Sequence, residues 1–343
     1  MSPLTLSRQR HRLLIDGLGE RTPPLLRSRH FSVYALDGRQ AERDPEDILV
    51  VHDFTVEQID NNVAAHVADE LLPLLARLQP PAAVQPSGYS YSESQRFERY
   101  VGAIVRSMDG NERRAWHRFY DNTLAALQSP ALQSPGPAAV LNGGADFIAA
   151  FRAIYGRVAE LAAQVAANSI LDVATCFGFL PLTLAGRSNG NGHGPRRRIV
   201  GCDLNPALVT LADDYRRQRL VPSTVFIRAD ILSDAAAREL DPVGAGFDVV
   251  TAIHLLEHLT EDETLRAMDA LWALSKRRLI IAVPFETVPD VRFGHRRVFD
   301  RDSLHALGRH VDGRPRVFED HGGWLVVDRP QGSQTLEQRE ALA

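Results

Sequence analysis

Two cysteines are the whole thiol content of this 343-residue chain, and Lys276 is its single lysine among 39 basic residues. Cys176 and Cys202 each fall near the end of a predicted strand, which excludes a secreted disulfide framework and favours a reduced, cytoplasmic protein. The skew from lysine to arginine is typical of a GC-rich genome rather than of a binding function.

Long apolar runs are also missing. Nowhere do about 18 consecutive apolar residues occur, so we expect no membrane span. The Arg-rich N-terminus is followed by no apolar segment, which argues against a signal peptide. The formal net charge of −4 provides no basic field for a nucleic acid, so we expect no nucleic-acid partner.

The chain shows three regions. Residues 1–145 contain two short β-like runs, at 31–34 and 48–51, and helical patterns at 56–75, 95–108 and 111–127. We expect a mainly helical N-terminal region here, acting as a cover for an acceptor site. A Pro- and Ser-rich linker at 129–137 precedes an α/β region at 146–330, and a polar tail follows at 331–343.

The α/β region alternates helices and strands. Strands are expected at 169–174, 198–203, 224–229, 247–253 and 279–283, with helices between them. This alternation predicts a Rossmann-like, doubly wound and mostly parallel sheet. Two closing strands near 316–318 and 324–327 have no helix between them, which indicates an antiparallel hairpin at one edge of the sheet.

Three successive strands end on carboxylates, Asp172, Asp203 and Asp230. In an open α/β sheet, ligands bind beyond the carboxyl ends of the strands. Asp203 is suited to accept hydrogen bonds from a ribose diol, although both NAD and S-adenosylmethionine carry one. The alternative for Asp203 is a helix cap, but Asn205 is better placed for that role.

The turn after the first of these strands distinguishes the two cofactors. Residues 174–178 keep only one glycine, Gly178, whereas a dinucleotide turn needs several for close approach of the pyrophosphate. The methionine end of S-adenosylmethionine is smaller, and Asp172 can pair with its ammonium group. Asp230 can accept from the adenine amino group, with Ile231 offering its amide to the ring. The alternative is a plain strand–turn–helix junction.

The fourth strand leads into His254, Glu257 and His258, which share one face if the segment is a helical turn. Such a set can bind a divalent metal or act as a general base. His295 follows the fifth strand and falls at the same edge of the sheet. A structural or solvated role is the alternative for each histidine.

Residues 146–329 resemble class I S-adenosylmethionine-dependent methyltransferases, through ILDVATCFGF, VGCDLNP, RADIL, FDVVTAIHLLEHL and VPFE. The resemblance implies a methionine side lined by Asp172, Ala174, Cys176 and Gly178, with Asp203 on the ribose and Asp230 on the adenine. The family has glycine at positions 174 and 176, so this chain departs from it there. The expected cofactor-binding set is Asp172, Ala174, Cys176, Gly178, Asp203, Leu204, Asp230, Ile231 and His254.

The LLEH and GHRRVFDRDSL segments resemble a subgroup rich in O-methyltransferases, some of which hold a divalent metal with a Glu-x-x-Glu-His set. Here His254 replaces the first Glu, which leaves metal use open; the candidate ligands are His254, Glu257 and His258. IHLLEHL, FGHRRVFDRDSL and HGGWLVVDRP are also similar to the mycofactocin oligosaccharide methyltransferases, which implies a sugar hydroxyl as acceptor.

The sequence therefore predicts an S-adenosylmethionine-dependent O-methyltransferase with His258, Glu257 and His295 as catalytic residues. Its acceptor would be a hydroxyl of a small molecule or an oligosaccharide. Five aromatic residues of the N-terminal region are candidates to stack on sugar rings: Tyr89, Tyr91, Tyr100, Trp116 and Tyr120. The spacing of Trp116, Phe119 and Tyr120 equally suits a helix core. An NAD-dependent oxidoreductase and a non-catalytic binding module remain as alternatives, and the oligomeric state stays open.

Overall fold

The computed structural model describes residues 23–35, 48–78, 92–129, 146–188 and 197–330. The chain divides into two compact units. Unit 1 comprises Met1–Arg152 with Asp290–Gly294, and unit 2 comprises Ala153–Pro289 with His295–Ala343. Most of the expected linker, the expected tail, Tyr89 and Tyr91 lie outside the described residues.

Unit 1 contains an antiparallel sheet of β1 (Leu26–Arg27), β2 (Phe31–Ala35) and β3 (Ile48–His52) in that order. The two β-like runs of the sequence are thus strands β2 and β3, so this region is not helical alone. Its helices are η1 (Val56–Gln58), α1 (Asn62–His66), η2 (Val67–Leu71), α2 (Leu72–Ala76), α3 (Glu93–Ser107) and α4 (Glu112–Gln128).

The single helix expected over 56–75 is instead broken into four pieces. A 3-10 turn, η1, comes first, and α1, η2 and α2 then follow one another, with η2 a π-helix. Apolar periodicity alone does not distinguish these windings, because over pieces of only three to five residues their different periods hardly change the apolar pattern. Val63, Val67 and Leu71 are fully buried, as the spacing predicts.

Helices α3 and α4 begin at side-chain caps. Ser92 accepts a hydrogen bond from the Gln95 amide in a capping box, and Asn111 accepts from the Arg114 amide. Trp116, Phe119 and Tyr120 are 6%, 0% and 0% exposed, so their helical spacing reflects a core. Burial removes Trp116 and Tyr120 from the residues available to stack on a sugar.

Unit 2 is built on a seven-stranded sheet in the order β6-β5-β4-β7-β8-β10-β9. Its strands are β4 (Ser169–Val173), β5 (Arg198–Asp203), β6 (Thr224–Arg228), β7 (Phe247–Ile253), β8 (Ser275–Val283), β9 (Arg314–Glu319) and β10 (Gly323–Asp328). Strands β4 to β8 pair in parallel, and β10 pairs antiparallel with both β8 and β9. The prediction of a Rossmann-like sheet with an antiparallel edge hairpin is confirmed.

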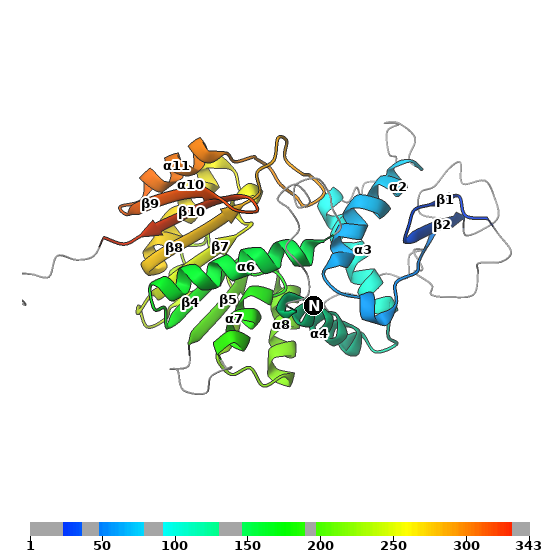
Figure 1. Cartoon of the computed structure of the whole chain (residues 1–343), viewed down its shortest axis with the longest axis horizontal. Coiled ribbons are helices and arrows are strands. Elements are labelled where there is room, and N and C mark those ends of the chain that lie inside the picture. The colour runs from blue at the N-terminus through cyan, green and yellow to red at the C-terminus, as the bar shows by residue number, and fades with distance from the viewer. Residues whose placement is uncertain (1–22, 36–47, 79–91, 130–145, 189–196, 331–343) are drawn as a thin grey trace, which may run out of the picture. The chain divides into compact units, whose positions relative to one another are not determined.

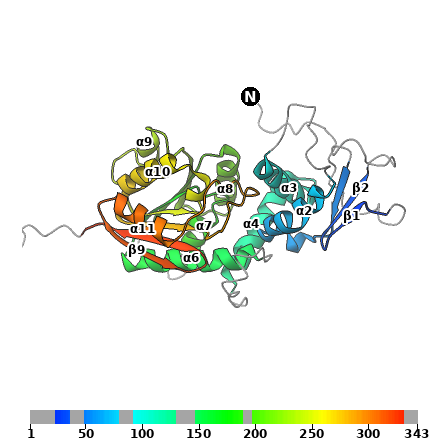
Figure 2. The same ribbon diagram turned by 90° about the horizontal axis from the view of Figure 1, so that it is seen from above.

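Helices cover both faces of this sheet, as Figure 1 and Figure 2 show. They are α6 (Phe147–Gln164), α7 (Phe179–Ser188), α8 (Pro206–Gln218), α9 (Ala236–Leu240), α10 (Glu261–Leu274) and α11 (Arg301–His310). Alternate strand residues pack with α9, α10 and α11 in one buried cluster that includes Leu171, Val250 and Ile281. Because side chains alternate along a strand, Ile170, Asp172 and Thr251 are directed to the opposite face.

Thr260 caps α10 in a capping box with Glu263. Among the described residues no helix combines the length and the apolar character needed to cross a membrane.

Candidate functional site at the carboxyl edge of the sheet

The strand register brings the predicted site residues to one edge of the sheet. Val173 of β4 is paired with Cys202 of β5 on one side and with Ala252 of β7 on the other. The residues just beyond these pairs are Ala174, Asp203 and Ile253, and they therefore stand level. The strand order reverses between β4 and β7, which is the topological switch point where such folds bind ligands.

The turn between β4 and α7 has an unusual backbone. Ala174, Cys176 and Gly178 all adopt left-handed conformations, with φ of 58°, 52° and 73°. Side chains with a Cβ rarely occupy this region, so Ala174 and Cys176 hold strained conformations that glycine would adopt freely. The structure thus gives a physical reason for glycine at these positions in the family that the sequence resembles.

Two carboxylates hold this turn in place. Asp203 accepts a hydrogen bond from the Cys176 amide at 2.8 Å, and the Thr175 hydroxyl donates to Asp172 at 2.7 Å. Thr175 also donates its amide to the Cys202 carbonyl at 2.9 Å. The turn is therefore fastened to the ends of β4 and β5 before any ligand is considered.

Asp172 is a buried carboxylate, 3% exposed. Its two oxygens accept hydrogen bonds from the Thr251 and Thr175 hydroxyls, both at 2.7 Å. Burial raises the pKa of Asp172 to about 6, against the lowering effect of these two hydrogen bonds. Asp172 thus helps to fix the turn, and its contact with a ligand ammonium stays a prediction.

Asp203 is half-buried at the end of β5, where both of its oxygens bind the backbone. One oxygen accepts from Cys176 and the other accepts from the Asn205 amide at 2.8 Å. An ionised carboxylate has about four acceptor positions, so room remains for hydroxyl donors. Asn205 caps α8 by accepting from the Ala207 amide, as the sequence predicts. Leu204 is 60% exposed between them, as an apolar side chain beside the site.

Asp230 lies beyond the end of β6, next to the Asp203 strand. One of its oxygens accepts from the Leu232 amide at 2.9 Å, and the carboxylate is half-buried. Ile231 is 7% exposed and belongs to the buried cluster under α9 and α10. The backbone at 230–232 is therefore fixed by a local turn.

The segment after β7 differs from the expected helical turn. The structure has a 3-10 turn, η3 (Leu256–His258), that begins two residues after His254. His254 itself has a left-handed φ of 56° and donates its amide to the Ala282 carbonyl of β8. A helical wheel that includes residue 254 is therefore wrong for this segment, although His254 Nδ1 lies 3.4 Å from Glu257 Oε1.

The structure assembles a three-residue group from Glu257, His258 and His295. One potential ligand atom from each lies within 4.8 Å of the others. The rings of His258 and His295 meet edge to face with centroids 4.9 Å apart. The Arg296 amide donates to the Glu257 carbonyl at 2.7 Å, which ties the segment after β8 to η3. His295 thus joins the set in the position expected of His254.

Glu257 is 1% exposed, and neither of its carboxylate oxygens forms a hydrogen bond of normal geometry to another described residue. Burial, together with the nearby Glu286 carboxylate, raises the pKa of Glu257 to about 8. A buried carboxyl group in this condition must either keep its proton or meet a cation. This donor set fits a divalent ion, since Glu257 supplies an unsatisfied oxygen beside two imidazoles.

Four residues near the site are not among those predicted from the sequence. Thr175 and Thr251 hold Asp172, and Glu286 accepts from His295 Nδ1 through oxygens at 2.9 and 3.0 Å. Tyr155 of α6 is the fourth; its phenol is buried near Asp172 and Cys176, and this burial raises its pKa. Glu286 stands in the VPFE segment, so a carboxylate after β8 is the one signal that points to it.

Among known proteins, similarity to this chain is found only with solved structures. The chain matches no protein-family model and no curated protein. Among solved structures it is similar to the methyltransferase domain of bacterial CtHen1, with 16% identity and a TM-score of 0.43 over 53% of this chain and all of that one.

Two further similar structures contain a cofactor or its product. The amino pentose methyltransferase CalS10 from Micromonospora echinaspora, with bound SAM, shows 19% identity and a TM-score of 0.40 over 52% of this chain and 90% of that one. Magnesium protoporphyrin IX methyltransferase from Synechocystis PCC 6803, with bound SAH, shows 15% identity and a TM-score of 0.40 over 64% of this chain and 98% of that one. At such values the fold of this chain is assigned from its own sheet order, and its function from its own side chains.

Replacing Gly178 by alanine should destabilise the turn. A Cβ at Gly178 would lie 2.4 Å from a ring carbon of the buried Phe226, on a backbone with positive φ. Overpacking and the left-handed backbone together predict a loss of about 2–4 kcal/mol in the free energy of unfolding. Gly110→Ala is the control, because a Cβ at that position would have no neighbouring atom within 4 Å. Equal urea midpoints for the two variants would contradict this account of the turn.

Asp172→Asn should change how stability depends on pH. The folded pKa of Asp172, about 6, lies above its ordinary value of 3.8, so the folded protein binds this proton more tightly and loses stability as the pH rises from about 4 to about 6. Asparagine does not titrate; its amide oxygen can accept from one threonine hydroxyl, while its NH2 group must donate to the other, whose hydroxyl turns round to accept. Between pH 5 and pH 7.5 the variant should gain about 1 kcal/mol relative to the parent protein. Parallel urea-unfolding curves at the two pH values, with no relative gain, would be the opposing result.

Proposed function

We propose that this protein transfers a methyl group from S-adenosylmethionine to a hydroxyl of a small molecule. The observation that carries the proposal is the convergence of Asp172, Asp203 and Asp230 at the ends of β4, β5 and β6, around a turn with three left-handed residues. This arrangement occupies the switch point of the sheet, where a nucleoside-containing ligand is expected.

In the proposed complex each strand end meets a different part of the cofactor. Asp203 accepts hydrogen bonds from the ribose hydroxyls, because its oxygens retain free acceptor positions beside the Cys176 and Asn205 amides. Asp230 and Ile231 meet the adenine. The backbone of residues 174–178 borders the methionine end, and Asp172 acts indirectly by holding Thr175.

The same turn argues against NAD. A pyrophosphate needs close approach to a glycine-rich backbone and the amides of a helix N-terminus. Here Ala174 and Cys176 place Cβ atoms on that backbone, and the Cys176 amide is already bonded to Asp203. A smaller, positively charged sulfonium makes no such demand.

Methyl transfer to a hydroxyl forms an oxygen–carbon bond, breaks the sulfur–carbon bond and releases one proton from the acceptor. Alignment of donor and acceptor supplies most of the acceleration. Without a bound ion, His258 is the residue proposed to receive the proton, with Glu257 and His295 beside it, and Glu286 fixes the ring of His295 through its Nδ1. A divalent ion held by Glu257, His258 and His295 would make the acceptor hydroxyl more acidic.

The narrower proposal for the acceptor is a sugar hydroxyl of a mycofactocin oligosaccharide. It is supported by the resemblance of IHLLEHL, FGHRRVFDRDSL and HGGWLVVDRP to that group of enzymes. Two of these segments contain Glu257, His258 and His295, the residues that the acceptor hydroxyl would meet.

A thermal-shift titration tests the cofactor assignment. S-adenosylhomocysteine should raise the melting temperature of the full chain by about 5 °C at 100 times its Kd, since a ligand that binds only the folded state stabilises it. Asp203→Asn should weaken that shift, and the exposed Asp269→Asn should leave it unchanged. Stabilisation by NAD alone would indicate the oxidoreductase, and a response to neither ligand would indicate a binding module without catalysis.

Substitution of Glu257 or His258 separates an effect on catalysis from an effect on cofactor binding. Glu257→Gln and His258→Gln should each lower methyl transfer to hydroxylated acceptors by about 100-fold, the scale of a lost general base. Affinity for S-adenosylhomocysteine, measured by calorimetry, should stay within about twofold, and a chelator should inhibit the parent enzyme. His310→Gln, at an exposed pair with Asp269, is the matched control. Parallel loss of turnover and cofactor affinity would contradict the catalytic assignment.

A further inference from the structure

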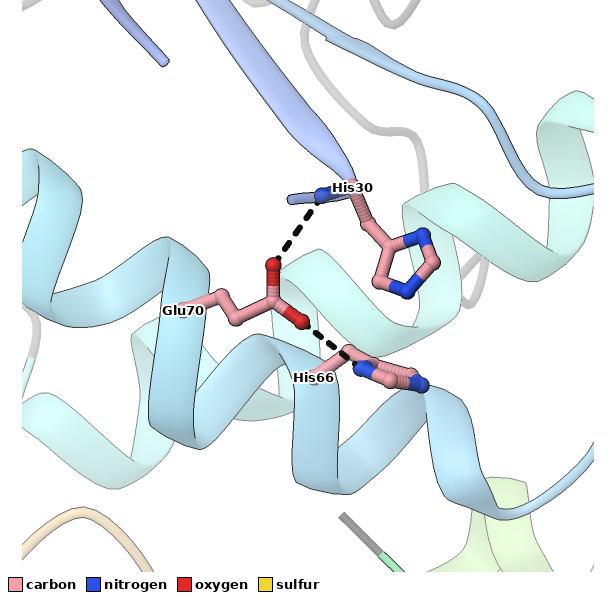
Figure 3. Close-up of side chains that lie close together, drawn as sticks. All are labelled: His30, His66 and Glu70. Carbon is pink, nitrogen blue, oxygen red and sulfur yellow. Dashed lines mark hydrogen bonds and ion pairs between the residues drawn. The ribbon is translucent and has the colours of Figure 1, made fainter. Parts of the chain in front are cut away.

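A second cluster of histidine and carboxylate side chains lies in unit 1. His30, His66 and Glu70 each bring one potential ligand atom within 4.8 Å of the others (Figure 3). His30 comes from the bend between β1 and β2, His66 ends α1, and Glu70 belongs to η2. Nothing in the proposed methyl transfer uses these residues.

Each imidazole has one nitrogen fixed by a carboxylate. Asp53 Oδ1 lies 2.9 Å from His30 Nδ1, and Glu70 Oε1 lies 2.9 Å from His66 Nδ1. Asp53 keeps the proton of His30 on Nδ1, so the lone pair of that ring is on Nε2. At His66 it is Nδ1 that faces Glu70 Oε1, so an ion held by these two atoms would replace the proton they share. Histidine ligands of metals are oriented by such carboxylates. In Figure 3 the lower ring nitrogen of His30 is directed toward His66.

Glu70 links the two halves of the cluster. Its other oxygen, Oε2, accepts the His30 amide at 3.0 Å, so one carboxylate fixes both His66 and the backbone before β2 (Figure 3). Glu70 thus brings a carboxylate, the negatively charged donor of the group, to the point where the two imidazoles meet.

The surroundings are those of a built site rather than of a solvated surface. The side chains of His30, His66 and Glu70 are 14%, 16% and 18% exposed, so an ion can enter but little water remains around it. The Phe54 ring packs on both imidazoles, with centroids 4.9 Å from His30 and 5.3 Å from His66.

The backbone here also departs from regular winding. The π-helix η2 begins immediately after His66 and contains Glu70. Single π turns inside helices occur frequently at functional sites, because they displace a side chain from its regular position. The irregular winding thus contains Glu70 and directly follows His66.

We propose that His30, His66 and Glu70 bind one divalent transition-metal ion of the Zn²⁺ class. Two neutral imidazoles and one carboxylate form a donor set that Zn²⁺ prefers over Mg²⁺ or Ca²⁺, which take oxygen ligands. Ligand atoms on a tetrahedral Zn²⁺ lie about 3.3 Å apart, so small side-chain rotations must close the group. The fourth position is left to water, and the bound ion would join the sheet of unit 1 to its first helices.

Zinc binding to the full chain tests this site. The other group that could bind zinc, Glu257, His258 and His295, must first be disabled so that it does not add to the measured binding. In a Glu257→Gln/His258→Gln background, the chelator-treated protein should bind one equivalent of ZnSO₄ by calorimetry and elemental analysis, and MgSO₄ should not replace it. Saturating zinc should raise its melting temperature by about 5 °C. Adding His66→Gln should reduce the zinc affinity at least 100-fold, whereas adding His310→Gln should have no effect.

A measurement on the unmutated chain covers the case in which a variant fails to fold. Diethyl pyrocarbonate labels accessible histidines, and peptide mass spectrometry locates the labels. Zinc should protect His30 and His66 at least fivefold, with His310 labelled equally in its presence and absence. Unchanged labelling of His30 and His66 at saturating zinc, or a full equivalent of zinc retained by the folded His66→Gln protein, would overturn the proposal. Neither outcome depends on methyl transfer.

Discussion

The left-handed turn after β4 is the constraint on which the proposed cofactor site depends. Three of its five residues, Ala174, Cys176 and Gly178, hold positive φ, a conformation that needs external support when a Cβ is present. That support comes from hydrogen bonds to Asp172 and Asp203, at the carboxyl ends of the neighbouring strands β4 and β5. Asp172 holds the turn through the Thr175 hydroxyl and Asp203 holds it through the Cys176 amide, so each carboxylate fixes a different residue of the turn.

Burial has a different effect on the carboxyl group of Glu257, which would face the acceptor, than on Asp172. Asp172 is buried but fully hydrogen-bonded, whereas Glu257 is buried without comparable partners and its pKa is raised to about 8. A carboxyl group kept at this cost is typical of a site for proton transfer or for a cation. Glu286 adds order by fixing the ring of His295. Structural and reactive carboxylates thus stand at neighbouring strand ends.

Much of the fold is predictable from the sequence, because strand and helix periods are set by burial. The parallel strands, the edge hairpin and the caps at Thr260 and Asn205 follow from local patterns. The winding of η2 and η3 does not, since over pieces of three to five residues the different periods hardly change the apolar pattern. Windings of this kind decide which side chains meet, so the pairing of His258 with His295 required the structure.

Contacts between distant segments were also beyond the sequence. His30 and Glu70 are 40 residues apart, and a histidine before a short strand carries no mark of a partner on a helix. Thr175 and Thr251 gave no signal either, because their hydroxyls act only through Asp172. By contrast, the carboxylates Asp172, Asp203 and Asp230 were found from sequence because each directly follows or ends a recognisable strand.

Hydrogen exchange measured by mass spectrometry, with and without S-adenosylhomocysteine, tests the central claim most directly. The account predicts slower exchange in three short stretches at the carboxyl edge, 174–178, 203–205 and 230–232, with little change in α10 or in β9 and β10. Saturating ligand that slows exchange elsewhere and leaves these three stretches unchanged would contradict it.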